Sequence, residues 1–154
     1  MTNVVMALKA LKKTIVDNIA DYLPQNNELE VPIPEISEKN VLIENPDIDK
    51  LPYSVTVYLV PDYSSLQNFT TCSITSSDTV KVWIFCKRDK QENLIGKSVM
   101  VYSAILQTIL NNRTLGKFNG VVDFQSADFY PSISATNTLS GYELTLSIRY
   151  PLSV

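Results

Sequence analysis

The feature that most constrains the fold is a strict two-residue alternation of side chains over Thr79–Arg88. One face of this segment holds Val80, Val82, Ile84 and Cys86, and the other holds Lys81, Trp83, Phe85 and Lys87. Successive side chains of a β-strand point to opposite faces, so this period predicts a strand. Because a solvated sheet face is usually more polar than one bearing Trp83 and Phe85, we expect something else to cover that second face.

Further strands are predicted on either side of this segment. Tyr53–Val60 alternates cleanly until Pro61-Asp62, and Asn68–Ser76 alternates more weakly, with Ser77-Asp78 as a hairpin turn before the next strand. Towards the C-terminus, Val121–Tyr130 and Tyr142–Tyr150 read as two strands joined by a loop. These patterns predict five strands, with room for a short sixth at Asn40–Glu44.

Two segments show the three- and four-residue spacing of helices. The first covers Asn3–Leu23 and ends before Pro24. The second begins at a capping box formed by Asp89 and Glu92 and continues to about Asn112. The apolar stripe of the first helix comprises Val5, Leu8, Leu11, Ile15, Ile19 and Tyr22, and that of the second Ile95, Val99, Tyr102, Ile105, Leu106, Ile109 and Leu110. Met100 and Val101 widen the second stripe, so we expect this helix to be buried on more than one side.

The order of these elements predicts an α+β fold. Residues 1–154 would form one domain, a mainly antiparallel sheet with both helices packed on it, in the order α, extended arm, β-β-β, α, β-β. A chain of 154 residues is long enough to bury about two thirds of its unfolded surface.

The extended arm, residues 25–52, differs from the rest of the chain in charge. It carries seven acidic and two basic residues, against nine acidic and eleven basic residues elsewhere. Its prolines break regular structure, while Val41 and Ile43 are among its apolar anchors. We expect the arm to contact another subunit through such anchors and through Glu35 and Glu38. The alternative is an insertion folded onto its own domain.

Composition argues against catalysis. The chain has no histidine, which excludes histidine-dependent triads and histidine-ligated metals. Cys72 and Cys86 form no metal-binding or redox motif, and the four glycines form no phosphate-binding loop. Asp123 and Asp128 are five residues apart on a predicted strand and should point to opposite faces. We therefore expect no enzyme activity, no catalytic residue, no cofactor and no metal.

Partners are constrained by charge and hydropathy. A net charge of −3 argues against specific nucleic-acid recognition, and no apolar run approaches the length of a membrane span. Lys87, Arg88 and Lys90 form a short basic cluster that is either a solvated loop or a docking patch for an acidic surface. Together with Trp83, Phe85, Met100 and Val101, this cluster supplies interface candidates outside the arm.

The C-terminal half resembles the tail terminator, or tail-completion, proteins of long-tailed bacteriophages. The likeness lies in the order of elements after an N-terminal helix and a β-meander: the helix ending in Leu110–Gly116, then Val121–Phe124, Asp128–Pro131 and Tyr142–Tyr150. The resemblance implies a small α+β subunit of a homo-oligomeric, six-fold ring in the virion, assembled in the host cytoplasm. Such a ring caps the tail tube and meets the head connector, a task that needs no catalytic residue.

Two other classes stay open at this point. One is a different structural subunit of a phage or phage-like injection machine, such as a head-completion or tube protein. The other is a small enzyme or ligand-binding domain that uses carboxylates.

Overall fold

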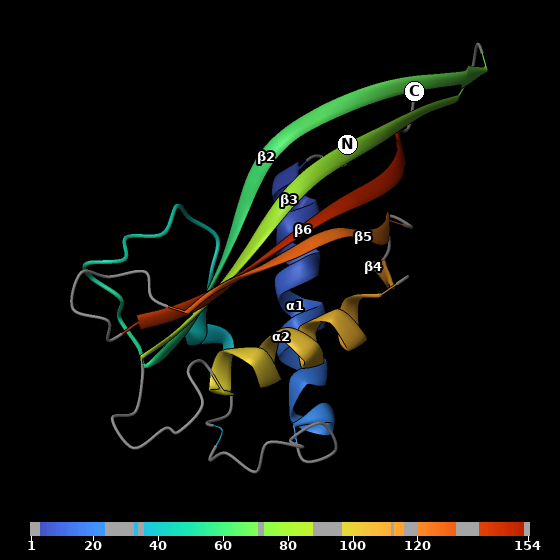
Figure 1. The fold of residues 1–154 in the computed structure, drawn as a ribbon. Helices are drawn as coiled ribbons and strands as arrows, with labels where there is room; N and C mark the ends of the chain where they lie inside the picture. The colour runs from blue at the N-terminus through green and yellow to red at the C-terminus, as the bar shows by residue number, and fades with distance from the viewer. Residues whose placement is uncertain are drawn as a thin grey trace.

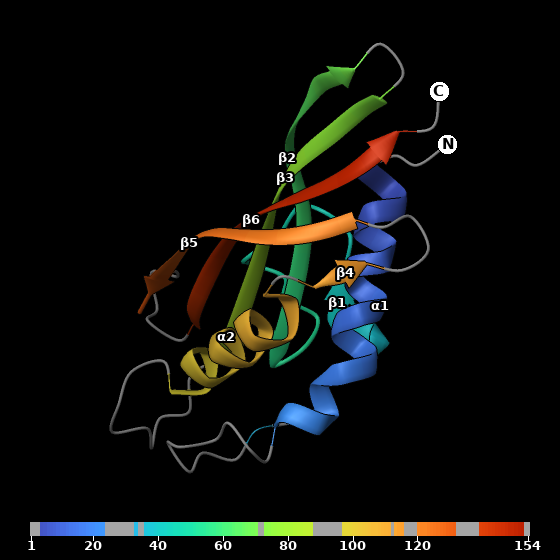
Figure 2. The same ribbon diagram turned by 90° about the vertical axis from the view of Figure 1, so that its right-hand side faces the viewer.

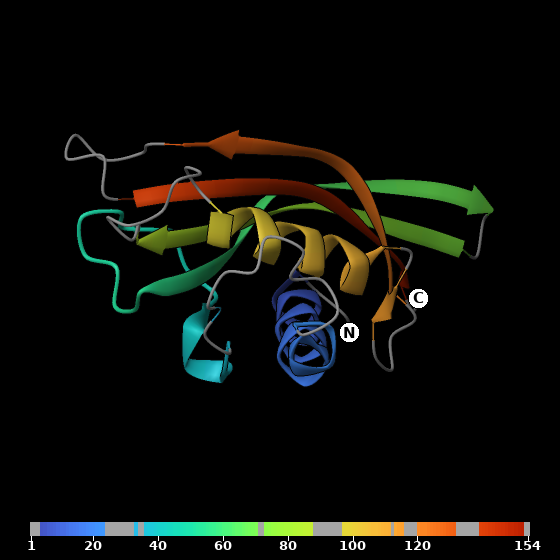
Figure 3. The same cartoon turned by 60° about the horizontal axis from the view of Figure 1, so that its bottom comes forward.

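The structure is a computed structural model, which describes residues 4–23, 33, 36–70, 73–87, 97–111, 113–115, 120–131 and 139–152. Helices α1 (Val4–Tyr22) and α2 (Lys97–Leu110) lie on the same face of a curved sheet and cross each other steeply (Figures 1 and 3). The sheet comprises β1 (Val41–Leu42), β2 (Val55–Thr70), β3 (Ser73–Lys87), β4 (Thr114–Leu115), β5 (Gly120–Tyr130) and β6 (Leu139–Leu152). A short 3-10 helix, η1 (Glu38–Asn40), precedes β1.

The strands are arranged in the spatial order β1-β2-β3-β6-β5-β4. Every pairing is antiparallel except that of β1 with β2, which is parallel. The two helices and the mainly antiparallel sheet confirm the α+β class, but the detailed order of elements differs from the expected one.

The main difference is that β2 and β3 form one long hairpin. Pro61 does not end β2, because the pairing shifts register between Pro61 and Tyr63 and the strand continues past the proline. Such an irregularity accommodates a residue that cannot donate to the ladder. The turn expected at Ser77-Asp78 is also wrong: Ser77 pairs with Ser65 of β2 and Arg149 of β6. Backbone pairing on both sides overrides the turn preference of these polar residues.

The shortest strands are the hardest to predict. The optional strand at Asn40–Glu44 is present as β1, where Val41 pairs with Val57. Strand β4 was not expected. It has only two residues, Thr114 and Leu115, which pair with the start of β5. Two residues are too few to show the alternation of side chains that identifies a strand in a sequence.

The main core lies between the helices and the sheet. The even-numbered side chains of β3 from Val80 to Cys86 are buried there, as predicted, together with Val55, Val57 and Leu59 of β2. From α2, the core takes Val99, Tyr102, Ile105, Leu106, Ile109 and Leu110, which confirms the described part of the predicted stripe. Ile95 and the predicted capping box fall outside the described residues.

Helix α1 begins its buried stripe differently from the prediction. Val5 is 50% exposed, whereas Ala7 is fully buried and Val4 packs against the core. Val4 lies four residues before Leu8 and therefore on the same face of the helix. The buried stripe thus continues from Leu8 to Val4, and Val5 faces outward.

The distal part of the β2–β3 hairpin projects beyond the helices (Figures 1 and 2). Strand β6 stays paired with β3 almost to the tip of this projection, where Leu152 pairs with Ile74. Strand β5 stops earlier, at the pairing of Val121 with Arg149. The projection is therefore three strands wide, and it lacks the helix layer that covers the rest of the sheet.

Candidate interaction surfaces

The sheet face opposite the helices carries an aromatic cluster, which we define as Tyr58, Trp83, Phe85 and Tyr130. Trp83 stacks on Phe85 with ring centroids 5.5 Å apart, and it also lies 5.5 Å from the ring of Tyr130. Phe85 further meets Tyr58 edge-on at 5.8 Å. Such pairs stabilise beyond the area that they bury, so the cluster stiffens this end of the sheet.

The chain itself covers part of this face. Phe85 and Tyr58 are each only 2% exposed, because Leu139 and the partly buried Leu42 and Leu51 pack around them. Tyr130, in contrast, is 39% exposed at the rim of the cluster. The sequence predicted that this face would be covered. Residues of the same chain do cover Phe85, but they leave Trp83 partly exposed and Tyr130 exposed.

Beside the aromatic cluster and beyond it, the same face carries two ion pairs. Lys81 Nζ lies 2.9 Å from Glu143 Oε1, and Arg149 Nε lies 2.7 Å from Asp123 Oδ2. The hydrogen bond from Lys81 to Glu143 raises the pKa of the lysine. The Lys81–Glu143 pair is largely covered, since Glu143 is 8% exposed, whereas the Arg149–Asp123 pair farther along the face is open to solvent.

The expected separation of Asp123 and Asp128 onto opposite faces is wrong. Asp123 pairs with Ser147 and Asp128 with Glu143, and these two residues of β6 share one face. The register shift between Phe124 and Ser126 adds one residue to β5 and reverses the alternation beyond it. The two carboxylates therefore share a face but stand at separate pairs of the ladder.

The structure places the predicted interface residues in different environments. Val41, Phe85 and Val101 are 0%, 2% and 3% exposed, so the chain covers them itself. Glu38, Ile43 and Lys87 are exposed, and Trp83 and Met100 are partly buried. Glu35 and Arg88 fall outside the described residues. The surface that these candidates can offer to another subunit therefore comes from the exposed and partly buried members.

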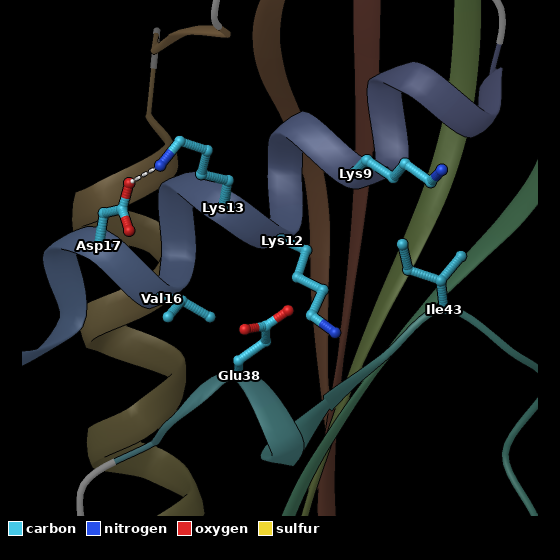
Figure 4. Close-up of a pocket in the computed structure, with 7 residues that line it drawn as sticks. All are labelled: Lys9, Lys12, Lys13, Val16, Asp17, Glu38 and Ile43. Atoms are coloured by element: carbon cyan, nitrogen blue, oxygen red, sulfur yellow. Dashed lines mark hydrogen bonds and ion pairs between the residues drawn. The ribbon is translucent and has the colours of Figure 1, made fainter.

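A groove of about 440 Å³ runs between α1 and the η1–β1 segment (Figure 4). Lys9, Lys12 and Lys13 enter it from α1, and Lys13 Nζ lies 2.7 Å from Asp17 Oδ2. The opposite wall is formed by Glu38 and Ile43, and Val16 also contributes apolar surface. We call this the lysine groove; the sequence showed its lysines only as the polar side of a helix.

The wall facing α1 is held in place by Asn40. The Asn40 side chain donates to the carbonyl oxygen of Val55, at 3.0 Å, and accepts from the backbone N–H and hydroxyl of Ser37, both at 3.0 Å. Val41 follows directly and is fully buried in the core. These contacts fix η1 and β1 to the start of β2, so the groove has a rigid wall on that side.

The described residues offer neither a metal site nor a membrane-spanning helix. No group of three or more histidine, cysteine, aspartate or glutamate side chains could hold a metal ion among them. No helix in the described ranges is long and apolar enough to cross a membrane. Cys86 is a buried free thiol in β3, and Cys72 is outside the described residues.

Comparison with known proteins gives a fold and no family. No protein-family model matches the chain, and no curated protein matches it. Among solved structures, it is similar to a chain described as "Virion of native gene transfer agent (GTA) particle". The two share 9% sequence identity with a TM-score of 0.50, over 75% of this chain and 81% of that chain. At this identity the likeness shows a shared fold.

Proposed function

We propose that this protein is a structural component of a phage-like virion and that it acts as a tail terminator. In this role, copies of the chain form a closed ring that caps the tail tube and meets the head connector. The protein works through its surfaces and not through catalysis.

One observation carries the proposal: the fold is shared with a chain from the virion of a gene transfer agent particle, over most of both chains. Fold alone does not determine function, so the surfaces must supply the rest of the argument. The resemblance to tail terminators in the C-terminal half, where α2 is followed by the long strands β5 and β6, is a second line of support for a virion role.

The surfaces are suited to assembly. The β2–β3 hairpin projects past the helix layer, and its strand edge beyond Tyr58 has no partner in the described part of the chain. Among the residues whose side chains the structure describes, the large apolar ones left exposed are Val5, Met6, Ile43, Ile48 and Tyr130. Exposed apolar groups and free strand edges are features that a partner subunit can cover.

Negative-stain electron microscopy of the purified protein tests the proposal. Closed rings of uniform diameter are expected for a terminator, because a heterologous interface that closes gives a ring. Open filaments would instead identify a tube-like subunit. Isolated single chains at every concentration would contradict a ring-forming role.

A further inference from the structure

The lysine groove holds positive charge that the chain leaves unpaired. Lys13 is bonded to Asp17, but no described residue forms an ion pair with Lys9 or Lys12. Figure 4 shows Lys12 reaching from α1 toward Glu38 on the opposite wall and Lys9 lying on the side of Ile43, with Val16 on the other side of Lys12. Three lysines and two acidic residues line the groove, so its lining is positive overall. A segment that combines acidic side chains with an apolar tip would match this lining.

Such a segment lies on the same chain between β1 and β2, at Glu44–Asp49, which we call the acidic turn. Glu44, Asp47 and Asp49 are all exposed. Between them, the apolar side chain of Ile48 is 38% exposed. The acidic turn thus presents an apolar tip flanked by carboxylates.

The acidic turn has a defined shape and a fixed base. The Asp47 side chain accepts from the backbone N–H of Asp49 at 3.2 Å, and the Asp47 carbonyl accepts from the N–H of Lys50 at 3.2 Å. Just beyond it, Leu51 packs against the aromatic cluster. Because the turn is already shaped, little conformational entropy is lost when it docks.

The two surfaces face different sides of one chain. The groove lies between α1 and the η1–β1 segment. The chain between β1 and β2 leaves the sheet edge on the side away from α1 (Figures 1 and 3). Leu42, which precedes the turn, and Leu51, which follows it, both pack in the cluster that contains Tyr58 on the sheet face opposite the helices. The acidic turn therefore lies towards that face and does not fill its own groove.

We propose that the acidic turn of one copy docks into the lysine groove of a second copy, with Ile48 against Val16 and Ile43 and with Glu44 and Asp49 near Lys9 and Lys12. This inference rests on the proposed function, because it supplies a subunit contact for the ring. Charge complementarity selects the second copy as the occupant. A nucleic acid is disfavoured, since two lysines without an ion pair to a described residue are a small positive surface on a chain with a net charge of −3.

Charge reversal with compensation tests the docking. The groove variant is K9E/K12E, and the turn variant is E44K/D49K, which keeps the Asp47 bonds that shape the turn. All four side chains are surface groups outside the core, so both variants should fold, which circular dichroism checks. A control, D21K, reverses one acidic side chain at an exposed position of α1 that does not line the groove.

Sedimentation velocity over a concentration series gives the expected results. Each reversed variant alone should associate at least about tenfold more weakly than the wild type, and the control should associate normally. An equal mixture of the two variants should regain association, because each then offers the other a groove and a turn of opposite charge. Adding salt should weaken the wild-type contact.

The other outcomes overturn the proposal in distinguishable ways. If the wild type stays monomeric, both the ring and the docking fail. If the wild type associates but neither variant is weakened, or if the mixture is not rescued, the docking is wrong while the ring stands. If only the groove variant is weakened, another acidic surface occupies the groove and the acidic turn does not.

Discussion

Tyr150 of β6 donates a hydrogen bond of 2.5 Å from its hydroxyl to Oδ2 of Asp78 in β3. Both residues are buried, at 3% and 1% exposed, on the helix-covered side of the sheet. The other carboxylate oxygen of Asp78 accepts from the Ser76 hydroxyl at 3.3 Å. This cluster ties β3 to β6 at the start of the projection, where apolar core residues give way to polar ones.

Removing the Tyr150 hydroxyl should destabilise the fold. A Y150F variant leaves a buried carboxylate without one of its donors, and the expected loss is about 1–3 kcal/mol in the free energy of unfolding. Urea denaturation measures it. Y142F is the matched control on the same strand, because Tyr142 is in ring contact with Phe129 and its hydroxyl makes no hydrogen bond to a described residue. Equal midpoints for the two variants would show that the bond to Asp78 contributes nothing.

Stability should fall in alkaline solution. Burial raises the pKa of Tyr102 and of Tyr150 above the ordinary 10.0, and in Tyr150 the bond to Asp78 adds to this effect. Burial and Glu44 do the same for Tyr58. The folded chain then keeps protons that the unfolded chain releases, so this stability is complete below about pH 10 and is lost as the pH rises through the folded-state values.

Two measurements check the alkaline prediction. Urea midpoints should decrease above about pH 10, and the ultraviolet absorbance of tyrosinate should show a group of tyrosines that titrates only on unfolding. A titration in which all eight tyrosines of the chain ionise together near their ordinary pKa, with the fold intact, would contradict the burial described here.

Shortening the buried side chains of helix α2 should destabilise the fold. Leu106 and Ile109 are 0% and 2% exposed within the core, so L106A and I109A should each cost about 2–5 kcal/mol of unfolding free energy. T108A is the control, because Thr108 is exposed on the same helix and its hydroxyl donates to the carbonyl of Ala104 one turn earlier. Near-wild-type midpoints for both core variants would mean that α2 is misplaced.

Assembly should change the environment of Trp83 and Tyr130, which form the rim of the aromatic cluster. Trp83 is the chain's single tryptophan, and its ring contacts the exposed Tyr130. If assembly covers this rim, Trp83 emission should shift to shorter wavelength as the protein concentration rises. Y130S should weaken association while changing the unfolding free energy by no more than about 1 kcal/mol. The control is Q125S, at another exposed position of β5, which should leave association unchanged. If the emission maximum of Trp83 does not move with protein concentration, this part of the cluster lies outside the interface.

Side-chain periodicity predicted the parts of the fold in which local pattern and packing agree. The alternation around Trp83 and the stripe through Tyr102 and Leu106 each identify a surface that the structure buries. The failures occur where pairing across the sheet decides the outcome. Neither the continuation of β2 past Pro61 nor the shift near Gln125 leaves a local signal, because each depends on the neighbouring strand.

The candidate surfaces were less predictable than the fold. Glu38 and Ile43 were expected at an interface and do line the lysine groove, but Lys9 and Lys12 on the other wall come from a helix that is far away in sequence. Val41, close to Ile43 in the chain, is instead part of the core. Charge bias identifies an acidic segment, whereas only the tertiary structure brings a helix face and a strand edge together.

The most direct test of the central claim is the mass of the assembled protein in solution, measured by light scattering on a size-exclusion column across a range of concentrations. A ring-forming virion subunit should elute as one closed species with a fixed mass, which for the proposed six-fold ring is six times the 17.3 kDa mass of one chain. The mass should stop growing once the ring closes. A mass of 17.3 kDa at every concentration, or a mass that increases without limit, would contradict the account.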